Sequence, residues 1–292
     1  MQENQWLTAH TRNLKNVRVA ITGPTGGLGE ETCRYLTSLG ATLVLLDRNE
    51  KRSTALQQRL RAEFPQVDLE RIPLDLADMG SVKRACEALK TNPPDILIHN
   101  AGAYSIPRHT CESGFDNVFQ INCASPYYLT QELLPLLRER RGHVVVVSSI
   151  AHNYAKTNPA DVDFATRHRA SLVYGNAKRR LTFALQELFL GEQEATLSVV
   201  HPGIAFTGIT AHYPKWLFAL IKHPMKLIFM KPKKACLSII NGVFESTGYH
   251  EWIGPRVFDI WGLPRRRALH TCSREESSKI AAQLLEWYKK AR

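Results

Sequence analysis

Apolar residues follow two alternating patterns along the chain. Short runs rich in β-branched residues, each the length of one buried strand, occupy residues 17–23, 41–47, 95–102, 143–149 and 197–203. Between them lie longer stretches with helical patterning, at residues 27–39, 50–63, 79–89, 117–138 and 172–190. Gly40 and Gly191 follow two of these stretches, where a glycine can take left-handed backbone geometry and end a helix. This alternation predicts an α/β fold in which a doubly wound parallel sheet lies between two layers of helices.

The chain contains no internal repeat, low-complexity tract or linker that would divide this alternation. Its 292 residues are 44% hydrophobic, which is enough for a sizeable core. We therefore expect one domain spanning residues 1–292.

A glycine cluster follows the first predicted strand directly, in the sequence TGPTGGLGEE that starts at Thr22. Glycines between a strand and a helix allow a tight turn and let the backbone approach a pyrophosphate at the helix N-terminus. Gly23, Gly27 and Gly29 fit the spacing TGxxxGxG, whereas Gly26 in place of Gly27 gives TGxxGxxG. The context predicts nucleotide binding and leaves the two spacings open.

The second predicted strand ends at Asp47, about 20 residues beyond the glycines. A carboxylate there can accept hydrogen bonds from the ribose hydroxyls of an adenosine. Arg48 could favour a 2′-phosphate instead, but Asp47 would repel that phosphate and the glycine turn contains no basic residue. NAD is therefore the predicted cofactor, with NADP as the alternative.

Tyr174 precedes Lys178 by four positions in the predicted helix 172–190. Residues four apart share a helix face, so the ammonium group is expected to lower a phenol pKa that starts near ~10. A tyrosine tuned in this way can act as a general acid or base. Taken alone, the pair is more typical of a solvated helix surface, and the rest of the chain must decide.

Several further motifs occur in a fixed order around these residues. They are HNAG at 99–102, Asn122 within FQINCASPYYLT, two serines at 148–149, YGNAK at 174–178 and HPGIAFT at 201–207. Together with the glycine turn, they make the sequence resemble the short-chain dehydrogenase/reductase family from about Val17 to Thr207. The NAG, Asn122 and PGxxxT matches favour the single-domain branch of that family, whose members use TGxxxGxG and a Rossmann fold.

The resemblance implies a catalytic role for four residues. Tyr174 would be the acid/base, Lys178 would lower its pKa and hold the nicotinamide ribose, and Ser149 would hydrogen-bond the substrate oxygen. Asn122 would anchor a water molecule that links Lys178 to solvent. The implied cofactor contacts are Thr22, Gly23, Gly27, Leu28, Gly29, Asp47, Arg48, Asp75, Leu76, Asn100, Ala101, Gly102, Tyr174, Lys178, Pro202, Gly203 and Thr207.

Each of these residues also has a structural interpretation. Ser148 and Ser149 could complete the hydrogen bonding of their strand, Asn122 could be a satisfied buried amide, and Asp75 or Thr207 could cap a helix. His99 departs from the family pattern, in which many members have a second asparagine before NAG. Ser149 lies 25 positions before Tyr174, a long spacing that resembles retinol-dehydrogenase-like and WW-domain-oxidoreductase-like members.

The apolar and aromatic stretch at 213–235 is flanked by lysines and interrupted by Lys222, His223 and Pro224. We expect the region 205–250 to cover the substrate. An interfacial segment on a membrane, or packing on the core or on another subunit of a homo-oligomer, are the alternatives.

Charge and cysteine content narrow the remaining function classes. Lys+Arg 38 against Asp+Glu 27 gives +11, but the basic residues are dispersed and lack interleaved aromatics, so nucleic acid is not an expected partner. The six cysteines show neither CxxC nor metal-ligand spacing, and the N-terminal residues lack the apolar core of a signal peptide. These features predict a cytoplasmic protein without a bound metal.

The leading functional hypothesis is an NAD(P)-dependent oxidoreductase that interconverts an alcohol and a carbonyl on a lipophilic small molecule, such as a retinoid or a steroid. A non-catalytic nucleotide sensor of the same fold is one rival, although a sensor has no chemical need for all four catalytic residues. A sugar-nucleotide epimerase is another, and it would need a larger C-terminal substrate domain.

Overall fold

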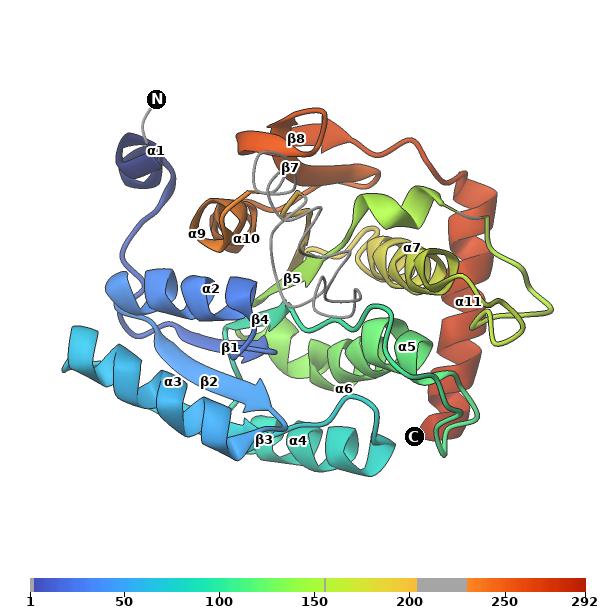
Figure 1. The fold of residues 1–292 in the computed structure, drawn as a ribbon, viewed down its shortest axis with the longest axis horizontal. Coiled ribbons are helices and arrows are strands. Elements are labelled where there is room, and N and C mark those ends of the chain that lie inside the picture. The colour runs from blue at the N-terminus through green and yellow to red at the C-terminus, as the bar shows by residue number, and fades with distance from the viewer. Residues whose placement is uncertain (1–2, 155, 204–229) are drawn as a thin grey trace, which may run out of the picture.

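A computed structural model describes residues 3–154, 156–203 and 230–292. Within these residues one sheet of eight strands has the order β3-β2-β1-β4-β5-β6-β7-β8. All neighbouring strands are parallel except β7 and β8, which form an antiparallel hairpin at one edge (Figure 1). The strands are β1 (Arg18–Thr22), β2 (Thr42–Asp47), β3 (Leu69–Pro73), β4 (Ile96–His99), β5 (His143–Val147), β6 (Thr196–Val200), β7 (Glu251–Val257) and β8 (Trp261–Ala268).

Helices cover both faces of the sheet, as Figure 1 shows. They are α1 (Glu3–His10), α2 (Gly27–Ser38), α3 (Glu50–Glu63), α4 (Met79–Thr91), α5 (Asn117–Phe119), α6 (Ser125–Glu139), α7 (Ala170–Leu188), α9 (Pro232–Ala235), α10 (Leu237–Phe244) and α11 (Arg274–Ala291). Side chains alternate along each strand, so Val19 and Ile21 of β1 enter one core with α2, α3 and α10. Ala20 enters the opposite core with α4, α6, α7 and α11. The predicted doubly wound fold is confirmed.

Local sequence explains how several helices begin and end. The Asn49 side chain accepts a hydrogen bond from Arg52 N and caps α3, and Asp78 caps α4 in the same way through Gly80 N. Gly40 has a φ of +89° just after the α2 C-cap, as predicted. Gly191 also has a positive φ of +79°, although it lies two residues beyond the α7 C-cap Phe189.

The predicted helix 117–138 differs from the structure. It is broken by a π-helical turn at Gln120–Ala124, between α5 and α6. Such a turn shifts the helical repeat by one residue, but residues 116–130 are all buried, so no boundary between a buried and an exposed face reveals the shift here. The turn contains Asn122.

The part of the region 205–250 that the structure describes includes α10, which packs into the core through Ile239, Ile240 and Val243. A Cβ on Gly242 would lie 2.4 Å from Val200 Cγ1, so α10 lies directly against β6. Residues 204–229, including Thr207, lie outside the described residues. Among the helices described, none is long and apolar enough to cross a membrane.

Candidate active site

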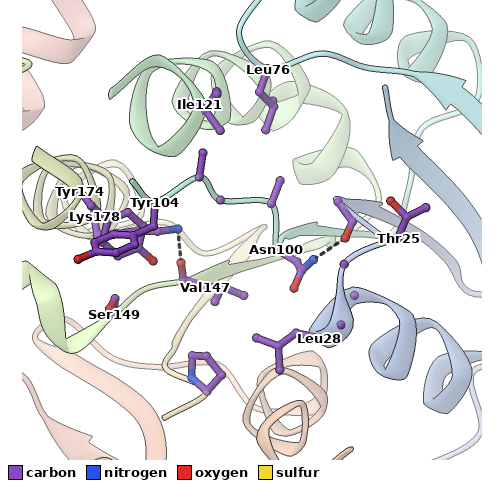
Figure 2. Close-up of a pocket in the computed structure, with 18 of the residues that line it drawn as sticks. Thr25, Leu28, Leu76, Asn100, Tyr104, Ile121, Val147, Ser149, Tyr174 and Lys178 are labelled. Atoms are coloured by element: carbon purple, nitrogen blue, oxygen red, sulfur yellow. Dashed lines mark hydrogen bonds between the residues drawn. The ribbon is translucent and has the colours of Figure 1, made fainter. Parts of the chain in front are cut away.

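A cavity of about 910 Å³ opens at the carboxyl ends of β1, β2, β4, β5 and β6. This end of a doubly wound sheet, where the strand order reverses between β1 and β4, is where such folds bind ligands. Most of the predicted cofactor contacts line the cavity. Figure 2 shows three of them, Leu28, Leu76 and Asn100, around the same pocket as Ser149, Tyr174 and Lys178. Thr22 and Asn122 do not line it and act from behind its wall.

The glycine turn places the α2 N-terminus against this cavity. Gly23 has a φ of +63°, and a Cβ there would lie 3.0 Å from Ala101 Cα. At Gly29 a Cβ would lie 2.2 Å from the Gly23 carbonyl oxygen, which no side chain permits. The glycines thus allow the turn to fold against β4 while the free backbone N–H groups of the first helical turn face the pocket.

Thr22 and Asn100 fix the glycine turn to the end of β4. The backbone N–H groups of Asn100 and Ala101 donate to Thr22 Oγ1 at 3.1 and 3.0 Å. Asn100 Nδ2 donates in return to the carbonyl oxygens of Thr22 and Gly23, both at 3.0 Å. These two side chains therefore hold the glycine turn against the end of β4, and Asn100 also lines the cavity.

Asp47 lies at the far end of the cavity and is buried. Its Oδ1 faces Arg71 Nε at 3.4 Å, whereas its Oδ2 is buried without a hydrogen-bond partner. Arg48 extends outward, with its side chain 70% exposed and Nη1 3.7 Å from Asp75 Oδ2. A buried carboxylate oxygen without a partner is costly unless it accepts a hydrogen bond, and a ribose hydroxyl could donate that hydrogen bond.

Asp75 and Leu76 follow β3 and line the same end of the cavity. Asp75 Oδ1 accepts a hydrogen bond from Ala77 N at 3.0 Å, which closes a local turn. The α4 cap is Asp78, so Asp75 does not have the capping role considered from the sequence.

Ser149 and Tyr174 meet on the opposite side of the cavity. Ser149 follows β5 and begins a 3₁₀ turn, where its Oγ accepts from Ala151 N at 3.2 Å. It also forms a hydrogen bond with the Tyr174 side chain. Ser148 is turned into the protein and pairs with Thr182 Oγ1 at 2.7 Å. Ser149 is therefore the serine able to meet a substrate beside Tyr174.

Lys178 lies one helical turn beyond Tyr174 on α7. Its Nζ donates to the Val147 carbonyl oxygen at 2.8 Å, as Figure 2 shows, and lies 5.7 Å from the centre of the Tyr174 ring. The ring of Tyr104 packs edge-on against Tyr174 with centroids 5.4 Å apart. The predicted proximity of Tyr174 and Lys178 is confirmed.

The predicted effect of this proximity on Tyr174 is wrong for the chain by itself. Burial raises the pKa of Tyr174 to about 12, and the hydrogen bond with Ser149 offsets only part of that rise. Burial also lowers the pKa of Lys178 to about 8. Removal from water disfavours the charged form of each group, and it is the largest cause of both shifts.

Asn122 is fully buried in the π-helical turn. Its Nδ2 donates to the carbonyl oxygens of Ala103 and Val118, both at 2.8 Å, and its Oδ1 accepts from Ala103 N at 3.2 Å. A Cβ on Gly102 would lie 3.0 Å from Asn122 Oδ1 and 3.6 Å from Lys178 Nζ, so Gly102 separates the two side chains. The amide thus holds the segment that follows NAG in place next to Lys178.

His99 and Gly203 complete the surroundings of the cavity. His99 is buried with Nε2 2.8 Å from Thr130 Oγ1, and burial together with the charge of Lys178 lowers its pKa to about 3. Gly203 lines the cavity beside Pro202 with a φ of +79°, and a Cβ there would lie 2.6 Å from the Ile260 carbonyl oxygen.

Two residues near Asp47 were not expected from the sequence. Arg71 on β3 pairs with Asp47, and Arg52 on α3 lines the cavity. Because β3 was not predicted, its register beside Asp47 could not be anticipated. Arg52 lies five residues after Asp47, in the first turn of the following helix. A basic residue at that position could have been recognised from the sequence as a neighbour of Asp47.

Two buried arginines next to Lys178 hold α7 in place. Arg179 makes a two-pronged contact with Glu276 of α11, at 2.9 Å from Nε and 2.6 Å from Nη2. Arg180 Nη1 donates to Gln283 Oε1 at 2.7 Å, also on α11. The helix that carries Tyr174 is thereby attached to the C-terminal helix.

The site as a whole defines a nucleotide-dependent oxidoreductase of the α/β class. A glycine turn at a helix N-terminus, an unpaired buried carboxylate oxygen at Asp47 and a tyrosine at the opposite end fit an extended dinucleotide.

Comparison with known proteins agrees with this class. The model of the short chain dehydrogenase family matches residues 17–160. Polyprenol dehydrogenase of Homo sapiens is 31% identical over 250 residues, covering 80% of this chain and 76% of that protein. Retinol dehydrogenase 14 of Mus musculus is 32% identical, covering 66% and 63%. The WW domain-containing oxidoreductase of Homo sapiens is 30% identical, covering 70% and 52%.

Solved structures show the same fold. An uncharacterized protein from Mycobacterium Paratuberculosis superposes with a TM-score of 0.73 at 24% identity, covering 97% of this chain and 96% of that one. A short-chain dehydrogenase from Sphingobium yanoikuyae in complex with NADPH has a TM-score of 0.61 at 24% identity, covering 77% and 83%. The chain belongs to the short-chain dehydrogenase/reductase family.

Proposed function

We propose that this protein interconverts an alcohol and a carbonyl compound on a lipophilic substrate, with NAD as cofactor and Tyr174 as acid/base. The observation that carries the proposal is the meeting of Tyr174, Ser149 and Lys178 at one end of a cavity whose other end has the glycine turn and Asp47. Two relatives are named for the long-chain alcohols retinol and polyprenol, which supports a lipophilic substrate.

The residues divide the cofactor between them. The first turn of α2 would hold the pyrophosphate, Asp47 Oδ2 would accept from the adenosine ribose, and Lys178 would reach the nicotinamide ribose. When bound, the dinucleotide accepts the hydride from an alcohol or supplies it to a carbonyl.

Tyr174 exchanges the proton at the substrate oxygen. With a pKa of about 12 it is protonated at neutral pH, so it can donate a hydrogen bond to a carbonyl oxygen and then its proton as negative charge develops there. Oxidation requires the reverse transfer, in which the phenolate accepts the alcohol proton. Ser149 donates a second hydrogen bond to the same oxygen, and the ammonium group of Lys178, 5.7 Å from the centre of the Tyr174 ring, favours the negative charge that a phenolate carries.

The remaining parts of the proposal concern the setting of the reaction. All six cysteines are buried and unpaired, which supports a reducing compartment such as the cytoplasm. We further propose that residues 1–292 act as one catalytic unit in which the region 205–250 covers the substrate. The role proposed for Tyr174 depends neither on the compartment nor on which segment covers the substrate.

The direct test is reduction of the cofactor, followed by the absorbance of the reduced nicotinamide. Steroids, retinoids, polyprenols and simple alcohols are each tried with NAD and with NADP. Turnover with a lipophilic alcohol supports the proposal. Tight cofactor binding without turnover on any of these substrates would indicate a nucleotide sensor instead.

A further inference from the structure

The β7–β8 hairpin ends in an apolar tip. Phe258 is 79% exposed, the highest value among the large apolar side chains that the structure describes, and its neighbour Val257 is 42% exposed. Trp261, at the start of β8, is 36% exposed. Single exposed apolar residues are ordinary, but three within five positions at the tip of a hairpin form a patch.

The backbone at this tip does not favour phenylalanine. Phe258 and Asp259 have positive φ values of 52° and 57°, and Ile260 N donates to the Val257 carbonyl oxygen at 2.9 Å. Glycine and asparagine suit such turn positions, whereas a bulky side chain there is disfavoured. An exposed aromatic in a disfavoured conformation contributes neither core packing nor turn stability, which points to a role outside the fold.

The strands behind the tip are basic. The hairpin carries four arginines, namely Arg256, Arg265, Arg266 and Arg267. Arg266 lies 3.7 Å from Glu251, and Arg267 lies 2.9 Å from Asp259. Arg256 and Arg265 are exposed and form no ion pair within the described parts of the chain, so two positive charges flank the apolar tip uncompensated.

The tip also adjoins the wall of the active-site cavity. The Asp259 carbonyl oxygen lies 3.0 Å from His201 Nε2, and the Ile260 carbonyl oxygen faces Gly203. His201 and Gly203 both line the cavity. A surface that receives the tip would therefore lie next to the substrate site.

We propose that the β7–β8 hairpin docks this protein on an anionic lipid bilayer. Phe258 and Val257 enter the interface between headgroups and acyl chains, and Arg256 and Arg265 contact anionic headgroups. A second copy of the chain fits less well, because it would bring arginine-rich strands together in a protein whose net charge is already +11.

Vesicle flotation tests this proposal without cofactor or turnover, so its failure leaves the proposed reaction untouched. Wild type is mixed with vesicles of phosphatidylcholine alone or with phosphatidylserine added. We expect binding only to the anionic vesicles, weakening as salt is raised. Replacing Arg256 and Arg265 with Gln should weaken it by about fivefold for each arginine.

Phe258→Asn separates lipid contact from folding. Asparagine tolerates positive φ, so the variant should melt at or above the wild-type temperature while its vesicle affinity falls about fivefold or more. Leu285→Asn on α11, where the leucine is 37% exposed, is the matched control and should bind like wild type. The proposal is overturned if wild type ignores anionic vesicles, if the hairpin variants bind unchanged, or if light scattering shows a dimer that Phe258→Asn dissociates.

Discussion

The ammonium group of Lys178 donates a hydrogen bond to the carbonyl oxygen of Val147 at 2.8 Å. Val147 is the last residue of β5, and Ser149 follows two positions later. The contact therefore fixes the position of α7 along β5, and with it the position of Tyr174 relative to Ser149. It also places a buried positive charge at the end of the sheet.

Lys178→Met should abolish most turnover and weaken cofactor binding while making the fold more stable at neutral pH. The pKa of Lys178 falls from 10.5 to about 8 on folding, so between these values the unfolded chain binds more protons and wild-type stability rises with pH. After subtracting the lost hydrogen bond, we expect the variant to gain about 1–2 kcal/mol at pH 7.

Urea unfolding of both proteins at several pH values measures this difference. The advantage of Lys178→Met should be constant below pH 8 and shrink as pH rises towards 10.5. A variant that is less stable than wild type at pH 7 would show that burial of this lysine costs little.

Tyr174→Phe should lower turnover by about 10²–10⁴-fold and leave cofactor affinity nearly unchanged, because the ring still packs while the proton is lost. Wild-type alcohol oxidation should accelerate with rising pH, since the phenolate fraction increases up to a pKa of about 12, and the variant should lose this dependence. Initial rates across pH 7–10 provide the measurement. Tyr127→Phe, which removes a buried hydroxyl bonded to Gln131 on α6, is the control and should keep full activity.

Gly29→Ala should destabilise the fold by more than about 2 kcal/mol and remove nucleotide binding. The added Cβ would lie 2.2 Å from the Gly23 carbonyl oxygen, so the turn must open. Gly26→Ala is the matched comparison, because its Cβ would meet nothing closer than 3.6 Å at a φ of −82°. Thermal melting and cofactor titration of the two variants should separate them; equal behaviour would argue against the close approach at Gly29.

The cofactor preference should depend on the charge of Asp47. We expect wild type to bind NADH more tightly than NADPH by about 1–3 kcal/mol, because a 2′-phosphate would meet the buried carboxylate. Asp47→Ser and the isosteric Asp47→Asn should both narrow the preference, since they leave Arg71 and Arg48 free to attract the phosphate. Fluorescence titration of both cofactors is sufficient, and tighter binding of NADPH by wild type would refute the assignment.

Sequence pattern predicted the central sheet well because its strands are uniformly apolar and its turns carry glycine. It missed β3, whose sequence LERIP places charges on an edge strand, and both strands of the hairpin, since β7 contains Gly254 and Pro255 and β8 contains a glycine, a proline and three arginines. The gathering of most candidate residues around the cavity followed from their order along parallel strands. The pairing of Asp47 with Arg71 and the pKa of Tyr174 did not, because both depend on burial and on neighbours that a local pattern does not contain.

The attachment of α7 to α11 has a consequence for biosynthesis. Arg179 and Arg180 find Glu276 and Gln283 about one hundred positions later in the chain, so a ribosome completes α7 long before its partners exist. Until α11 has been synthesised, the guanidinium groups of Arg179 and Arg180 lack these partners and should remain hydrated. The helix that bears Tyr174 and Lys178 is then not held in its final position. We therefore expect the face of α7 that bears Tyr174 and Lys178 to form only after α11 has been synthesised, and chains that stop before α11 to be recognised by chaperones and proteases as incompletely folded.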